Sequence, residues 1–267
     1  MKELLHIAIK AALRGGLEIL DVYDSDFDVE YKDDKSPLTL ADKRSNAVIE
    51  SYLLNTNIPV LSEEGREIGY EERKDWKRLW VVDPLDGTKE FVKRNGEFTV
   101  NIALVEQNKP VLGVIYLPVK GDLYFGASGV GAYKIKGSEL DDLDIESATI
   151  EEIIGASTKM PIKSSRTMFT VIGSRSHMSK ETEVYVNELR KEKGELDIIS
   201  AGSAIKLCLV AEGVADEYPR FAPTMEWDTC AGHAIANCVG KSVIDHTTQR
   251  EMLYNRENLV NNWFIVK

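Results

Sequence analysis

Residues 79–88, Leu-Trp-Val-Val-Asp-Pro-Leu-Asp-Gly-Thr, join a short apolar run to two carboxylates. The apolar run has the pattern of a buried strand, so we expect Asp83 and Asp86 to lie at its carboxyl end. Magnesium prefers a few carboxylate oxygens and keeps part of its coordination shell for water and substrate phosphate. The segment therefore predicts a metal site, although an acidic surface turn fits this stretch equally well when it is taken alone.

The residues between and after the two carboxylates favour a tight turn. Pro84 restricts its own φ and Gly87 relaxes the backbone, so the turn can direct the Leu85 carbonyl towards the same ions. A helix can begin directly after the turn. The amides of Gly87 and Thr88 would then face a phosphate from the helix N-terminus.

Two further acidic sites come before and after this segment. Residues 59–61 predict a short strand whose end delivers Glu63 and Glu64. Asp228 lies in Glu-Trp-Asp at residues 226–228, where a helix is predicted to begin and where an acid could instead serve as an N-cap. Three acidic sites of this kind, in this order, are much less expected by chance than any one of them.

The rest of the chain alternates between helix and strand patterns, and Thr39 can cap a helix that has Asp42 in its first turn. An acidic segment at 138–152 marks a boundary between an N-terminal lobe, residues 1–150, and a C-terminal lobe, residues 151–267, of one compact unit. These patterns support a mixed α/β fold. We expect helices over 1–20, 41–54, 179–192 and 203–212 and from about 227, a loop over 33–37, and strands over 100–105, 111–117, 123–125, 170–173, 196–199 and 215–218.

The 267 residues carry a formal net charge of −11. Such a charge repels phosphate polymers, so a nucleic acid polymer is not an expected partner. The three cysteines form no CxxC pair, which indicates core thiols in a reducing compartment rather than disulfides or zinc ligands. No stretch approaches the roughly 20 apolar residues that span a bilayer. We therefore expect a soluble, cytoplasmic protein.

Three motifs together carry a resemblance to a known family. Ser-Glu-Glu at 62–64, Trp-Val-Val-Asp-Pro-Leu-Asp-Gly-Thr at 80–88 and Trp-Asp-Thr-Cys-Ala-Gly at 227–232 resemble the signature of the inositol monophosphatase superfamily. Its members are lithium-sensitive, magnesium-dependent phosphatases, and the resemblance extends over nearly the whole chain. It implies the layered α/β/α/β/α sugar-phosphatase fold.

The resemblance also implies roles for individual residues. Asp42 and Thr88 correspond to the pair that orients and deprotonates the attacking water. Without the resemblance, Asp42 is better explained as a partner of the helix dipole. Paired ions would clamp the attacking and leaving oxygens of an in-line displacement. We expect two or three Mg²⁺ ions, held by Glu63, Asp83, the Leu85 carbonyl, Asp86 and Asp228.

Within the superfamily, residues 173–177, 202–206 and 216–220 resemble the CysQ-type 3'(2'),5'-bisphosphate nucleotidases. Those enzymes remove the 3'-phosphate of adenosine 3',5'-bisphosphate (PAP) to leave AMP, which clears a by-product of sulfate assimilation. The second phosphate of such a nucleotide would explain Arg220 and Lys206, since arginine can bind a phosphate bidentately and lysine can act as a point charge. The implied contacts to a phosphorylated nucleotide are Gly87, Thr88, His177, Ser203, Lys206, Arg220 and Asp228.

Two alternatives remain open. The first keeps the chemistry but exchanges the substrate for inositol monophosphate or another sugar phosphate, and cleavage of the sulfated nucleotide PAPS is a further option. The second is a noncatalytic acidic protein that binds calcium or a partner, which gives Asp42, Thr88 and Lys206 no shared purpose. The sequence does not set the number of ions, the oligomeric state or the role of residues 120–161.

Overall fold

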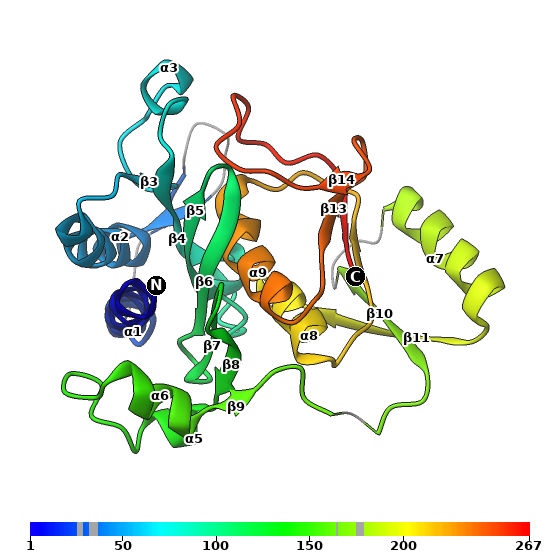
Figure 1. Ribbon diagram of the computed structural model, residues 1–267, viewed down its shortest axis with the longest axis horizontal. Helices are drawn as coiled ribbons and strands as arrows, with labels where there is room; N and C mark the ends of the chain where they lie inside the picture. The colour runs from blue at the N-terminus through cyan, green and yellow to red at the C-terminus, as the bar shows by residue number, and fades with distance from the viewer. Residues whose placement is uncertain (26–28, 32–36, 164, 175–178) are drawn as a thin grey trace.

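Five layers of secondary structure stack across the molecule in the order helices, sheet, helices, sheet, helix (Figure 1). The computed structural model describes residues 1–25, 29–31, 37–163, 165–174 and 179–267. Apolar residues fill each space between the layers and form one core cluster on each face of the first sheet and a smaller one under the last helix. The α/β/α/β/α fold predicted from the sequence is therefore confirmed.

The first layer consists of α1 (Lys2–Tyr23) and α2 (Leu40–Leu53), which lie side by side at the left of Figure 1. Apolar residues recur at helical spacing in α1, so one face is buried against the first sheet. The Thr39 side chain caps α2, because its hydroxyl accepts a hydrogen bond from the Ala41 amide. Both helices are as predicted. Most of the predicted loop at 33–37 lies outside the described residues.

A seven-stranded sheet forms the second layer, with the strands in sequence order from β3 to β9. The first two strands are parallel and the others are antiparallel. The strands predicted over 100–105, 111–117 and 123–125 are confirmed and form an antiparallel meander, which two more strands extend. The strands are β3 (Val60–Ser62), β4 (Arg78–Asp86), β5 (Thr99–Glu106), β6 (Lys109–Leu117), β7 (Asp122–Ala127), β8 (Gly131–Ile135) and β9 (Thr158–Lys159).

The tight turn predicted for residues 83–88 is wrong in its position. Strand β4 continues to Asp86, and its pairing with β5 shifts register between Asp83 and Asp86. Such a bulge leaves residues out of the hydrogen-bonded ladder. Proline, which has no N–H to donate, is therefore tolerated there. The turn itself comes at Gly87, which directly precedes the short helix α4 (Thr88–Val92). Its φ of 96° is a conformation that favours glycine.

The third layer holds α8 (Ile205–Glu212) and α9 (Glu226–Cys238), between the two sheets. The fourth comprises the four-stranded sheet β12-β15-β13-β14 and the parallel pair β10–β11, which a bridge between Val171 and Glu217 joins. The outer helix α7 (Lys180–Lys193) covers β10 and β11. The strands are β10 (Phe169–Ser174), β11 (Leu196–Ala201), β12 (Tyr218–Arg220), β13 (Val243–Asp245), β14 (Arg250–Glu251) and β15 (Phe264–Val266).

The strand predicted at 215–218 is wrong in position, because β12 begins only at Tyr218. Asp216 lies in the turn before it and accepts a hydrogen bond from the Thr170 amide. Pro219 is tolerated in β12 because that strand lies at the edge of the four-stranded sheet, where Pro219 is opposite Ile265 of β15.

Short elements complete the described chain: β1 (Val29–Tyr31), β2 (Pro37–Thr39), η1 (Leu54–Thr56), α3 (Tyr70–Arg73), α5 (Gly137–Leu140) and α6 (Ile150–Ala156). The division into lobes at residue 150 stays a prediction. The chain after that point still returns to the first sheet, since β9 pairs with β8.

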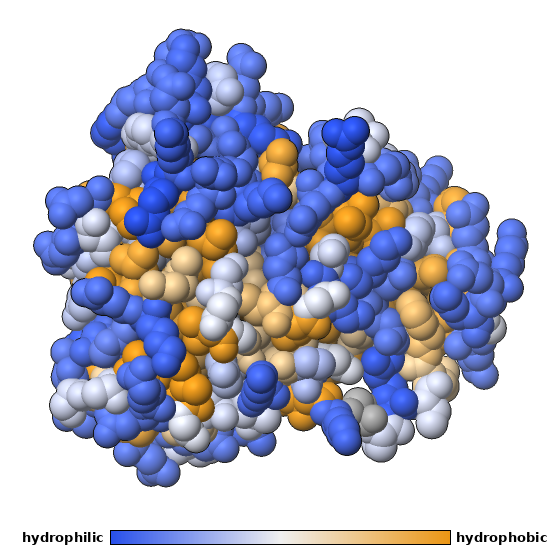
Figure 2. Space-filling view, in the orientation of Figure 1, coloured by the Kyte–Doolittle hydropathy of each residue, from blue (hydrophilic) through white to orange (hydrophobic). Residues whose placement is uncertain are grey.

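Polar residues cover most of the face shown in Figure 2, while apolar side chains gather towards its middle. The three cysteines are free thiols, as expected, and Cys208 and Cys230 are buried. Among the described residues, no helix combines the length and apolar character that crossing a membrane requires.

Candidate active site

Three carboxylates from two layers of the fold meet where the bulge of β4 faces the start of α9. Asp83 and Asp86 come from β4, and Asp228 lies in the first turn of α9. One oxygen from each of the three lies within 4.8 Å of the others. Oxygen atoms at this spacing, with no nitrogen or sulfur among them, are the donor set that Mg²⁺ prefers. The residues therefore fit a magnesium site.

The environment of these carboxylates disfavours negative charge when no cation is bound. Burial, followed by the charges of neighbouring carboxylates, raises the pKa of Asp83 well above its usual range. Burial likewise raises the pKa of Asp86 to about 6, although the Lys206 ammonium opposes the rise. Burial and the charge of Asp86 raise the pKa of Asp228 to about 8. Such a cluster is stabilised in its ionised form by a bound cation.

Asp228 is held by the start of its own helix. It is the third residue of α9, and its Oδ2 accepts a hydrogen bond of 2.8 Å from the Met225 amide at the N-cap. The carboxylate therefore satisfies the free amide at the helix start and also belongs to the acidic cluster. The sequence left capping and metal binding as alternatives for this residue, and the geometry accommodates both.

Asp42 has the same arrangement at the start of α2. Its Oδ2 accepts hydrogen bonds from the Thr39 amide at 2.8 Å and the Thr39 hydroxyl at 2.7 Å. Its Oδ1 lies 3.3 Å from the Thr88 hydroxyl, which is also 3.3 Å from the Leu85 carbonyl. The predicted pair of Asp42 and Thr88 is thus in contact, at the edge of the bulge that carries Asp83 and Asp86.

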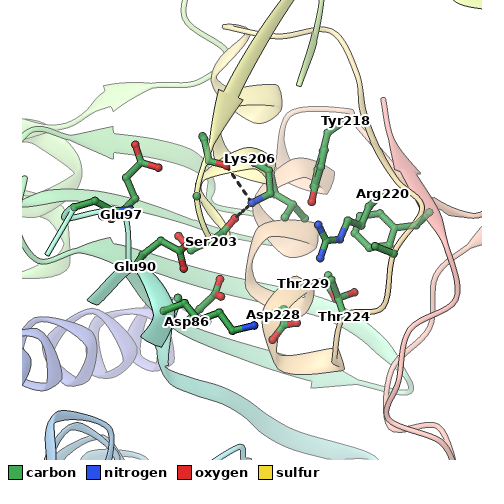
Figure 3. Close-up of a pocket in the computed structure, with 18 of the residues that line it drawn as sticks. Asp86, Glu90, Glu97, Ser203, Lys206, Tyr218, Arg220, Thr224, Asp228 and Thr229 are labelled. Atoms are coloured by element: carbon green, nitrogen blue, oxygen red, sulfur yellow. Dashed lines mark hydrogen bonds between the residues drawn. The ribbon is translucent and has the colours of Figure 1, made fainter. Parts of the chain in front are cut away.

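A cavity of about 720 Å³ opens beside the carboxylates (Figure 3). Asp86, Gly87 and Asp228 line one side, and Ser203, Lys206 and Arg220 line the other. Figure 3 shows the Lys206 and Arg220 side chains extending into the space between the second sheet and α9. Carboxylates and cations thus face one cavity, which suits a ligand with more than one anionic group.

Lys206 is fixed at the start of α8. Its Nζ donates to the Ser203 carbonyl at 2.6 Å and lies 3.4 Å from the Ala201 carbonyl. Burial lowers the pKa of Lys206 to about 8, the charge of Asp86 opposes this shift, and Arg220 adds to it. The ammonium is therefore held near Asp86 rather than on the molecular surface.

Two polar atoms at the cavity have no hydrogen-bond partner within the described part of the chain. They are the Ser203 hydroxyl oxygen and the Arg220 Nε, and both are buried. A buried polar atom of this kind costs free energy unless a ligand or water satisfies it. Ser203 also has a φ of 36°, which is unusual for a residue other than glycine. Backbone strain of this kind is concentrated at functional sites.

The structure brings most of the predicted site residues together. Glu63 lies outside the group of three carboxylates, but its charge contributes to the raised pKa of Asp83, Asp86 and Asp228. His177 lies outside the described residues. The roles assigned to all of these residues stay predictions.

Sequence reasoning missed several residues around the cavity. Asn101 pairs with Asp83 across β4 and β5, and its amide lies 3.4 Å from Asp86. A polar residue within the apolar run of β5 was the available signal. The Tyr218 ring lies 5.7 Å from Lys206 Nζ. Glu90, Glu97 and Thr224 also line the cavity, and nothing in their local sequence distinguishes them from surface residues. Thr229 lines it as well and lies within the motif at 227–232.

Comparisons with known proteins point to one family. The model of the inositol monophosphatase family matches residues 1–265. A 3'(2'),5'-bisphosphate nucleotidase CysQ of Salmonella typhimurium is 44% identical over 267 residues, which cover 98% of this chain and 99% of that protein. An Escherichia coli (strain K12) protein of the same name is 44% identical over 259 residues, with 96% of each chain covered.

Solved structures extend the comparison to the fold. A crystal structure of CysQ from Bacteroides thetaiotaomicron, described as a bacterial member of the inositol monophosphatase family, is 50% identical with a TM-score of 0.92 and covers 100% of this chain and 97% of its own. The suhB protein of Bartonella henselae is 25% identical, with a TM-score of 0.70 over 91% of this chain and 87% of its own. The chain therefore belongs to the inositol monophosphatase family.

Proposed function

We propose that this protein is a magnesium-dependent phosphomonoesterase that removes the 3'-phosphate of PAP to give AMP. The observation that carries the proposal is one cavity with a carboxylate cluster on one side and Lys206 and Arg220 on the other. A nucleotide with two phosphates would offer one to the carboxylate-bound metal and the other to these cations. The relatives at 44% identity are named for this activity.

The metal ligands in this proposal are Glu63, Asp83, the Leu85 carbonyl, Asp86 and Asp228, which would hold two or three ions. Bound Mg²⁺ would polarise the phosphate, lower the pKa of a water molecule and stabilise the leaving oxygen. The protein contributes the fixed positions of these oxygens, because the bulge of β4 holds two of the carboxylates and the Met225 amide holds Asp228.

Thr88 and Asp42 would move the proton of the attacking water. The Thr88 hydroxyl lies 3.3 Å from Asp42 Oδ1, so it can accept that proton while it passes its own to the carboxylate. Two hydrogen bonds from Thr39 fix the other Asp42 oxygen and therefore orient the acceptor.

Lys206, Arg220 and Ser203 would bind the phosphate that is not cleaved. The unsatisfied Ser203 hydroxyl and Arg220 Nε support this role, since an anionic ligand would supply the missing acceptors. The Gly87 and Thr88 amides would contact the phosphate that is cleaved, and His177 would contact the nucleotide. PAPS carries its additional group on the uncleaved phosphate, so it is a second candidate substrate.

We place the enzyme in the cytoplasm, in the removal of a by-product of sulfate assimilation. The three free thiols support a reducing compartment. Inositol monophosphate is the competing substrate within the same family.

Substitution of Arg220 tests the assignment of the second phosphate. Arg220→Ala should lower kcat/KM for PAP by about 10–100-fold, because a hydrogen bond to a charged group contributes roughly 1.5–3 kcal/mol. It should leave hydrolysis of inositol 1-phosphate unchanged, since that substrate has no second phosphate. The control is Arg190→Ala, which removes an exposed arginine from α7, away from the cavity.

Each other outcome rejects a defined part of the proposal. Equal losses on both substrates would reject a role of Arg220 in binding a second phosphate. A wild-type preference for inositol 1-phosphate would reject PAP as the substrate and keep the metal site. No phosphate release from either compound would favour the noncatalytic reading.

A further inference from the structure

The chain between β14 and β15 closes over the start of α9. The buried Glu226 accepts hydrogen bonds from the Asn255 amide at 2.7 Å and from the Arg256 amide at 3.1 Å. The Arg256 Nε also donates to Glu226, at 3.1 Å. In addition, the Glu226 amide donates to the Leu259 carbonyl at 3.0 Å. Residues 254–261, which we call the C-terminal strap, are therefore tied to the first turn of α9.

The Asn261 side chain makes several hydrogen bonds between the strap and the start of α9. Its Nδ2 lies 2.7 Å from the Met225 carbonyl, 3.0 Å from the Thr229 hydroxyl and 3.1 Å from the Thr224 hydroxyl. Arg256 Nη2 donates to the Asn261 Oδ1 at 2.8 Å. A guanidinium can only donate, so this contact fixes which side of the amide is oxygen and turns the NH₂ group towards α9.

These contacts lead directly to Asp228. The peptide unit that follows Met225 presents its carbonyl to Asn261, and the Met225 amide donates to Asp228 Oδ2. Met225 is thus held by the strap through one backbone group and holds the carboxylate through the other. Asn261 is buried and does not line the cavity, so any effect on the reaction must pass through the residues that it contacts.

We propose that Asn261, oriented by Arg256, is a positioning residue that holds Asp228 in place for the metal. The proposal rests on the role of Asp228 as a metal ligand under the proposed function. Hydrogen bonds behind a ligand set its orientation, and loss of such a partner typically weakens metal binding by about 10–100-fold. The strap would therefore tune metal affinity from outside the cavity.

The test is direct binding of Mn²⁺ to the full-length protein without substrate, measured by electron paramagnetic resonance, together with the thermal midpoint of each variant. Asn261→Ala should weaken Mn²⁺ binding by about 10-fold or more. The matched control is the neighbouring Asn262→Ala, because Asn262 is exposed and its amide donates to Asp245 instead. The control should bind Mn²⁺ as the wild type does.

Arg256→Lys provides a second variant if Asn261→Ala does not fold. Lysine keeps a cation beside Glu226 but lacks the fork that also reaches Asn261. It should weaken Mn²⁺ binding by several-fold, and high Mg²⁺ should restore its kcat. Lower thermal midpoints with unchanged Mn²⁺ affinity in these variants would overturn the proposal. Wild-type protein that binds Mn²⁺ but leaves PAP intact would reject the proposed substrate alone.

Discussion

Asp42 and Asp228 each use one carboxylate oxygen to accept a backbone hydrogen bond at the start of a helix. Asp42 accepts from the Thr39 backbone at the start of α2, and Asp228 accepts from the Met225 backbone at the start of α9. A side chain fixed in this way loses little freedom when it binds a ligand, so the site is pre-organised. Under the proposed function, each of these residues would combine a structural and a catalytic or metal-binding role.

Asp83→Asn should abolish phosphate release and stabilise the metal-free protein. The buried Asp83 has a raised pKa beside other carboxylates, and an amide of the same shape can still accept from the Leu85 amide. We expect a gain of roughly 1–3 kcal/mol in the free energy of unfolding in EDTA, seen as a higher thermal midpoint. Retained turnover, or a lower midpoint in EDTA, would contradict this role for Asp83.

The pH dependence of the free energy of unfolding should have opposite signs in the metal-free and the metal-bound protein. The folded-state pKa of Asp86 is about 6 and that of Asp228 about 8, both above the usual 3.8, so the metal-free folded state binds protons more tightly than the unfolded chain. Their contribution to stability should therefore fall as pH rises from about 4 to about 8. Thermal unfolding in EDTA and in Mg²⁺ measures this. An equal fall under both conditions would exclude metal binding by the ionised carboxylates.

Thr88→Val should lower kcat by about 10²–10⁴-fold, the usual contribution of a general base or proton relay. Valine matches threonine in shape, but it has no hydroxyl to connect the water with Asp42. Thr88→Ser is the matched control because it keeps the hydroxyl. Steady-state kinetics at saturating Mg²⁺ distinguishes them, and a Val variant as active as the Ser variant would remove Thr88 from the mechanism.

At the scale of elements, α9 must approach the first sheet closely for Asp228 to reach Asp83 and Asp86. Gly113 on β6 permits this approach, because a Cβ atom there would lie 2.1 Å from the Ala231 carbonyl oxygen on α9. The contact is with backbone, so a larger residue must displace the helix.

Gly113→Ala should therefore lower stability by about 1–3 kcal/mol, as overpacking usually does, and raise the Mg²⁺ concentration needed for half-maximal activity. Gly155→Ala is the control, because in the described parts of the chain no atom beyond its neighbours and the backbone of α6 lies within 4 Å of a Cβ placed on this glycine. Denaturant unfolding and Mg²⁺ titration give both quantities. Unchanged Mg²⁺ dependence in Gly113→Ala would show that the spacing of α9 does not set the site.

The sequence predicted those elements whose pattern is long or has clear ends. The periodic apolar residues of α1 and the Thr39 cap of α2 were sufficient, and so was the apolar run of β4. The bulge after Asp83 was not predictable, because it is set by pairing with β5, a contact that lies outside the segment. The C-terminal strands β13 to β15 have two or three residues each, too few for a periodic signal.

The site residues likewise divide into those that local sequence predicts and those that distant contacts determine. Motifs predicted the carboxylates of β4 and α9, because those residues lie within compact sequence signatures. They could not predict Asn261, which reaches α9 from the far end of the chain. Contacts of this kind depend on how the layers stack and not on local sequence.

On the scale of the whole molecule, the five layers bring three distant parts of the chain to one cavity. The first sheet supplies Asp86, the middle helices supply Lys206 and Asp228, and the second sheet supplies Arg220. Under the proposed function, these cations of a protein with a net charge of −11 would bind the second phosphate.

The most direct test is to identify the product formed from PAP. The wild-type protein should release phosphate from PAP with Mg²⁺ and leave 5'-AMP, with no release in EDTA and a higher kcat/KM than for inositol 1-phosphate. Formation of 3'-AMP instead would contradict the binding of the 5'-phosphate by Arg220. Absence of Mg²⁺-dependent hydrolysis of PAP would contradict the proposed function itself.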